Sequence, residues 1–188
     1  QKYYQKRGFE SARLDPVCDG YIYWTIADVG TPFSSQGLLN QFWQPKATLP
    51  KDFSGFNGPT AILAHMTPDV PVMAPGQSRK IEWWISNFDP KPLAGATLQW
   101  ELIGDDTLRG TIEGIHVAAG EVKKVGETAL VASRVARPRQ TKLTVELLCK
   151  WGLPLSNSWD LWLIPERQPR PESGKDLLAS KSVLAAVA

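Results

Sequence analysis

The chain has 188 residues, and its 21 lysines and arginines against 19 aspartates and glutamates leave a formal net charge of only +2. Because positive and negative charges are nearly equal in number, the composition gives no support to a nucleic-acid partner or to binding at an anionic membrane. Hydrophobic residues make up 43% of the chain, enough for a packed core, and no run reaches the roughly 18 apolar residues of a membrane-spanning helix. Cys18, Cys149, His65 and His116 form no ligand-like cluster, so we expect no metal site.

Residues 1–66 have the pattern of mixed α and β structure. Apolar and aromatic side chains recur at helical spacing in Tyr3–Leu14, which predicts a short amphipathic helix. Gly20–Ala27 is apolar at nearly every position and rich in β-branched and aromatic residues, which predicts a strand buried on both faces, as in a parallel sheet or barrel. Gly37–Trp43 and Pro59–His65 are predicted to be helical pieces of the next layer. One such α/β repeat cannot fold alone, because its parallel strand lacks a partner.

Residues 67–165 change to short alternating runs separated by turn residues. About seven strands are predicted here, at Asp69–Met73, Arg79–Phe88, Thr97–Ile103, Thr107–Val117, Val122–Val131, Lys142–Lys150 and Ser158–Ile164. The region Thr107–Val117 is predicted to hold one or two strands, around Gly110 and Gly114. Ile81, Trp83 and Ile85 share one face of the second run, and Trp100 lies on the inward face of the third. About seven strands within about 100 residues are typical of an antiparallel β-sandwich of immunoglobulin type. The expected fold class is therefore mainly β, an immunoglobulin-like sandwich preceded by a partial α/β segment.

Residues 166–188 change in composition again. Glu166–Gly174 is rich in Arg, Pro and Glu without periodicity and is predicted to be a linker, whereas the alanine-rich Asp176–Ala188 is predicted to begin a further segment. Cys18 and Cys149 fall in different units of this division, so we expect two thiols that are not bonded to each other.

A motif in the first third resembles a pattern of a known enzyme family. The motif consists of GYIYWTIAD at Gly20–Asp28, GLL from Gly37, and W-x-P-K from Trp43 to Lys46. This order is similar to the end of the catalytic (β/α)8 barrel, or TIM barrel, in glycoside hydrolase family 2, which includes β-galactosidases, β-glucuronidases and β-mannosidases. The resemblance covers residues 1–66, including the helix with Glu10 and Arg13. The sandwich that follows resembles the immunoglobulin-like domain that some members place after the barrel.

The resemblance implies a C-terminal fragment of a retaining glycoside hydrolase, with the catalytic glutamates of the family lying before this chain. A retaining enzyme needs two carboxyl groups about 5–5.5 Å apart. Residues 1–66 hold one glutamate, Glu10, on a predicted helix, and only Asp28 among the aspartates follows a barrel-like strand. We therefore expect that this chain alone does not hydrolyse glycosides. The implied mechanism requires no metal or organic cofactor.

Two residues of the motif are predicted to bind substrate. Trp24, near the exit of the strand, presents a flat apolar face on which a sugar ring stacks, as the family resemblance implies; the alternative is that Trp24 fills the barrel core. Asp28 is predicted to accept hydrogen bonds from sugar hydroxyls, or alternatively to brace the loop that follows. The expected partner is thus a carbohydrate, bound through the parent protein.

Two other functions are open on the sequence. One is a non-catalytic carbohydrate-binding module with an aromatic strip that includes an exposed Trp84, although packing against another part of the protein is the commoner role of such a residue. The other is a structural sandwich without a ligand. In each case the incomplete α/β segment is expected to expose aromatic surface around Tyr21, Tyr23 and Trp24, through which the chain self-associates.

Overall fold

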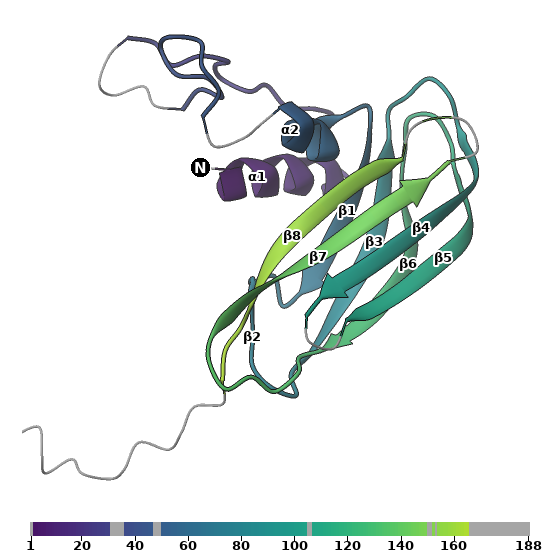
Figure 1. Ribbon diagram of the computed structural model, residues 1–188. Coiled ribbons are helices and arrows are strands. Elements are labelled where there is room, and N and C mark those ends of the chain that lie inside the picture. The colour runs from purple at the N-terminus through teal and green to yellow at the C-terminus, as the bar shows by residue number, and fades with distance from the viewer. Residues whose placement is uncertain are drawn as a thin grey trace, which may run out of the picture.

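The computed structural model describes residues 2–30, 36–46, 50–104, 107–149, 152 and 154–165. Helix α1 spans Lys2–Leu14 and helix α2 spans Pro50–Asn57. The strands are β1 (Thr60–Thr67), β2 (Val72–Met73), β3 (Ser78–Asn87), β4 (Leu93–Ile103), β5 (Leu108–Val117), β6 (Glu121–Val131), β7 (Arg139–Leu148) and β8 (Leu155–Leu163). They form two facing layers, and both helices lie beside β1 and β8 (Figure 1).

Two sheets make a β-sandwich, which confirms the predicted fold class. One sheet has the strand order β1-β3-β6 and the other has the order β2-β8-β7-β4-β5. Neighbouring strands are antiparallel except β2 and β8, which pair in parallel. Each of the seven predicted strand regions overlaps one of the strands β2 to β8, so the alternating pattern located these strands correctly.

The core lies between the two sheets and follows the alternation of the strands. Ile81, Trp83 and Ile85 of β3 are fully buried, as their shared face predicts. Trp100 of β4 is half-buried, and its ring lies 6.4 Å from that of Trp83 at an interplanar angle of 24°. Gly110 of β5 lies opposite Trp100, and a Cβ atom there would stand 2.7 Å from the indole, so only glycine leaves room for this ring.

The predicted helical piece Pro59–His65 is wrong, because the structure has β1 there. β1 pairs along its whole length with β3. Residues 61–63 are buried one after another, and periodicity cannot assign such a short continuous apolar run to a helix or to a strand. The β region therefore begins at Thr60, and the predicted boundary between residues 66 and 67 would cut an edge strand from the three-stranded sheet.

Helix α1 confirms the prediction for Tyr3–Leu14, and an aromatic cluster joins this helix to α2. The ring centroids of Tyr21, Tyr23, Phe53 and Phe56 all lie within 5.8 Å of that of Phe9. Gly55 brings α2 onto β8, because a Cβ atom at this position would stand 2.9 Å from the carbonyl oxygen of Ser156. The two helices and the aromatic cluster thus form a second small core against the edge of the sandwich.

The segment between the two helices projects away from the sandwich (Figure 1). The predicted strand Gly20–Ala27 and the predicted helical piece Gly37–Trp43 are both wrong, because the described residues here form only isolated bridges of Leu39 with Ala27 and with Pro45. A strand that is apolar on both faces needs partner strands at its edges, and no described residue supplies them. Residues 166–188, the predicted linker and further segment, lie outside the described residues.

Candidate functional site

A groove of about 630 Å³ lies beside Trp24, between α1 and the projecting segment. It is lined by Tyr4, Gln5, Tyr23, Trp24, Thr25, Gln36 and Lys46. Trp24 is 79% exposed, so it does not fill a core within the described part of the chain. Concave sites of about 300–1,000 Å³ that combine aromatic surface with a few polar groups are typical of small-molecule binding.

Tyr23 ties the exposed Trp24 to α1. The side-chain amide of Gln5 donates a hydrogen bond to the Tyr23 hydroxyl over 2.6 Å, and that hydroxyl donates to the backbone carbonyl of Gln36 over 2.6 Å. The Tyr23 ring also lies 5.5 Å from the ring of Phe9 in the aromatic cluster. The backbone next to Trp24 is therefore held at three points, while the indole itself is left to solvent.

Asp28 lies in the same segment, but it does not line the groove. Both of its carboxylate oxygens accept from the Lys46 ammonium at 3.0 Å, and one also accepts from the Gly37 backbone N–H at 2.8 Å. A Cβ atom at Gly37 would stand 2.5 Å from the Asp28 backbone nitrogen, so this close approach requires glycine. The geometry thus favours the loop-bracing role of Asp28, which places Lys46 at the groove.

Helix α1 is fastened to the sandwich by the buried carboxylate of Glu10, which lies 6% exposed. The Asn157 side-chain amide donates to one carboxylate oxygen over 2.9 Å, and the Trp159 indole N–H donates to the other over 3.0 Å. The Lys6 ammonium forms an ion pair with Glu10 and also donates to Asn157 over 2.7 Å. These contacts fix the helix that carries one side of the Trp24 groove.

The Lys6 ammonium is almost enclosed at this junction. It lies 4.1 Å from the centroid of the Trp159 ring. A cation at this position is attracted to the face of the indole. Burial lowers the pKa of Lys6 to about 8, although the adjacent Glu10 carboxylate acts in the opposite direction. About two turns beyond Lys6, the Arg13 guanidinium donates to the Ser86 hydroxyl over 3.1 Å and to the Gly58 carbonyl, which fastens the end of α1.

Other candidates from the sequence lie apart from this groove. Trp84 is half-buried on β3 with its indole nitrogen buried, which favours packing over an exposed aromatic strip. Cys18 and Cys149 are half-buried free thiols, and burial raises the pKa of Cys149. Within the described ranges, no three His, Cys, Asp or Glu side chains gather as metal ligands would, and no helix is long and apolar enough to cross a membrane.

Most of this chain is similar in fold to part of a known enzyme. The exo-chitosanase CsxA of Amycolatopsis orientalis aligns over 88% of this chain and 19% of its own, with a TM-score of 0.58 and 18% sequence identity. The complex of one variant of this enzyme with PNP-beta-D-glucosamine gives the same coverage, TM-score and identity. The complex of a second variant with the same compound aligns over 85% of this chain and 18% of its own, with a TM-score of 0.58 and 17% identity. This chain thus spans about a fifth of those structures.

The comparison of sequences adds a match to the sandwich alone. Residues 77–165, which take in strands β3 to β8, match the model of a domain of unknown function (DUF8488). No curated protein matches the chain.

Proposed function

We propose that this chain is the C-terminal part of a retaining glycoside hydrolase, in which Trp24 stacks on a sugar ring of the substrate. The main support is that the Trp24 indole is 79% exposed and lines a groove whose other side is formed by α1. The likeness in fold to an exo-chitosanase supports the proposal, because it covers 88% of this chain and so extends beyond the sandwich. The GYIYWTIAD motif supports it independently.

The groove has the chemistry to bind a sugar. The indole face of Trp24 offers apolar surface to the C–H groups of a pyranose ring, while the nearby Thr25 and Gln36 bring a hydroxyl and an amide for sugar hydroxyls. Asp28 acts in this proposal through Lys46, which it holds at the groove. Asp28 is therefore a positioning residue rather than a direct ligand of the sugar.

The chain is not catalytic by itself in this proposal. None of the described side chains that line the Trp24 groove carries a carboxylate, whereas a retaining mechanism requires two of them about 5–5.5 Å apart. The neighbouring Ile22 and Ile26 are 96% and 63% exposed, and this apolar surface is proposed to be covered by the rest of the enzyme. The chain then contributes a sugar platform to a site whose acid and nucleophile come from elsewhere.

The test is the binding of a glucosamine oligosaccharide, measured by titration calorimetry, together with hydrolysis of PNP-beta-D-glucosamine. We expect saturable binding without turnover, and at least tenfold weaker binding by a Trp24→Ala variant. A Trp162→Ala variant is the matched control, because Trp162 is 44% exposed on β8 and does not line this groove. Equal affinity of wild type and Trp24→Ala would overturn the proposal, as would turnover that depends on a residue of this chain.

A further inference from the structure

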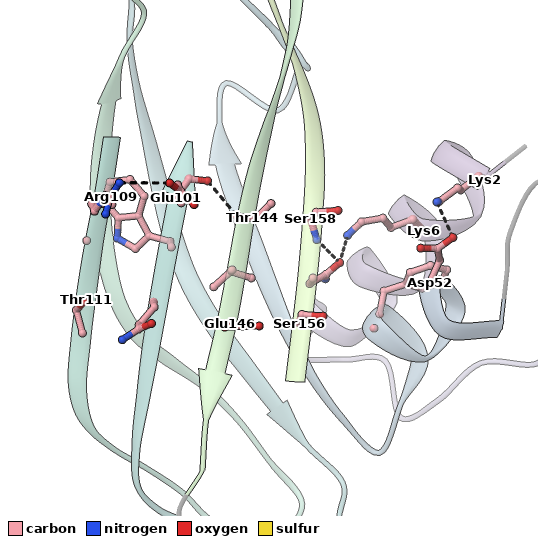
Figure 2. A pocket seen from close by; sticks show the side chains of 17 residues that line it. Lys2, Lys6, Asp52, Glu101, Arg109, Thr111, Thr144, Glu146, Ser156 and Ser158 are labelled. Carbon is pink, nitrogen blue, oxygen red and sulfur yellow. Dashed lines mark hydrogen bonds and ion pairs between the residues drawn. The ribbon is translucent and has the colours of Figure 1, made fainter. Parts of the chain in front are cut away.

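A second, larger groove lies on the outer face of the five-stranded sheet. Its volume is about 740 Å³, and side chains of β4, β5, β7 and β8 form its floor. Helices α1 and α2 form a wall along one side, where Lys2, Lys6 and Asp52 are placed (Figure 2). Among the residues that the structure describes, this groove shares no lining residue with the Trp24 groove.

The floor carries two rows of polar side chains that cross four strands. One row runs Arg109, Glu101, Thr144 and Ser158, and the other runs Thr111, Gln99, Glu146 and Ser156. Directly opposite side chains on neighbouring antiparallel strands have Cβ atoms about 4.5–5.5 Å apart. The floor therefore presents hydroxyl, amide, guanidinium and carboxylate groups in two rows on one face of the sheet, since residues paired across antiparallel strands share a face. Figure 2 labels Arg109, Glu101, Thr144 and Ser158 of the first row.

The cations around this groove already have partners. Lys2 forms an ion pair of 2.9 Å with Asp52, and the Arg109 guanidinium lies 3.6 Å from the Glu101 carboxylate. Lys6 is paired with Glu10. In contrast, Glu146 is exposed in the middle of its row and makes no ion pair with any described residue.

This balance of charges selects the kind of ligand. An anionic ligand would meet the unpaired Glu146 and would compete with carboxylates for the cations of the groove. An apolar ligand would cover polar side chains of the floor, such as Gln99 and Ser156, with apolar surface and offer them no hydrogen bonds, which is costly. A ligand rich in hydrogen-bond donors along its length satisfies both rows, and Glu146 accepts from its hydroxyl or amino groups.

We propose that the groove on the outer face of the five-stranded sheet is a non-catalytic binding site for an oligosaccharide, held by hydrogen bonds to the two polar rows. Its floor spans four strands, so it accommodates more than one sugar ring. The inference goes beyond the proposed function, because it does not involve Trp24 or the catalytic site of any parent enzyme. Together with the proposed function, such a site would retain a polymeric substrate on the sandwich, apart from the Trp24 groove.

The test uses the full chain with Trp24→Ala, so that the Trp24 groove does not contribute. Two probes are titrated, a glucosamine oligosaccharide and a cello-oligosaccharide, and backbone amide shifts are followed by NMR. We expect saturable shifts in β4, β7 and β8 at the groove. Adding Gln99→Ala and Glu146→Ala should weaken binding at least tenfold, because hydrogen bonds to a charged group are lost. If the glucosamine oligosaccharide binds and the cello-oligosaccharide does not, the specificity of the site comes from sugar amino groups that face Glu146.

A Lys142→Ala variant is the control, since Lys142 is exposed on β7 and lies outside the groove. It should bind both probes as the parent does. The absence of shifts at the groove with both probes overturns this inference, and so does binding that survives the double substitution. A loss of all binding on Trp24→Ala alone supports the proposed function and overturns the second site, so the two failures are distinguishable.

Discussion

Glu10 joins two parts of the molecule that are far apart in the sequence. Its carboxylate is buried, and its hydrogen-bond partners Asn157 and Trp159 lie on the last strand of the sandwich. Arg13 makes an equivalent link, to Ser86 on β3. The position of α1, and with it one side of the Trp24 groove, therefore depends on two charged side chains and their neutral partners.

A Glu10→Ala variant should lose about 3 kcal/mol of unfolding free energy, because the substitution leaves the buried Lys6 without its counter-ion. Urea denaturation of the purified variant measures this loss. Glu113→Ala is the control, since Glu113 is exposed on β5, and it should change the stability by less than about 0.5 kcal/mol. Equal stabilities of the two variants would show that α1 is not fastened through Glu10.

At the scale of the elements, the junction of α1 with β8 should respond to pH through Lys6. The pKa of Lys6 is lowered from 10.5 to about 8 in the folded protein, mainly by burial. Between these two values the unfolded chain binds more protons at this position, so the contribution of Lys6 to stability rises with pH. The unfolding free energy of wild type relative to Lys6→Met should therefore increase by about 2 kcal/mol from pH 7.5 to pH 10.

Urea denaturation of wild type and Lys6→Met at the two pH values measures this difference. Groups that titrate alike in both proteins contribute equally to both unfolding free energies, so their contributions cancel. A difference that stays constant, or that falls with pH, would contradict the burial of Lys6 as an ammonium between Glu10 and the Trp159 ring.

The elements also show how far the sequence alone could predict the fold. Strands with one buried face, such as β3 with Ile81 and Ile85 inward, have a period of two and were located correctly. The sequence does not distinguish β1 from a helix, because three consecutive residues are buried and the period of two disappears. Gly20–Ala27 has the composition of a strand but does not form one in the structure, because no described residue supplies the partner strands.

The candidate site could be predicted in part. The motif that contains Trp24 identified the segment and its exposed indole, but not the groove, which depends on Tyr4 and Gln5 of α1. The second groove was not predicted, since its rows combine strands whose register appears only in the folded sheet. Ser, Thr and Gln at alternating positions indicate only an exposed face, and no sequence pattern shows that α1 and α2 enclose one side of it.

At the scale of the whole molecule, the projecting segment leaves apolar surface uncovered. Ile22, Trp24 and Ile26 are exposed in alternation with half-buried neighbours, so one side of the segment is in contact with solvent. In the absence of a partner we expect the isolated chain to self-associate through this side. Sedimentation velocity should show an average mass that rises with protein concentration.

A variant with Ile22→Ser and Ile26→Ser should remain monomeric over the same concentration range. Val131→Ser is the control, because Val131 is 53% exposed on β6 and lies outside the projecting segment. Self-association that is unchanged in the double variant, or a wild type that is monomeric throughout, would show that this apolar side does not make the contact.

The central claim is that the exposed indole of Trp24 binds a sugar ring, and the indole N–H signals in the NMR spectrum test it most directly. The signal of Trp24 is the one that disappears in Trp24→Ala. On titration of the wild-type chain with a glucosamine oligosaccharide, the account predicts that this signal shifts with saturation and that of Trp162 does not. A Trp24 signal that stays unchanged at saturating oligosaccharide would contradict the account.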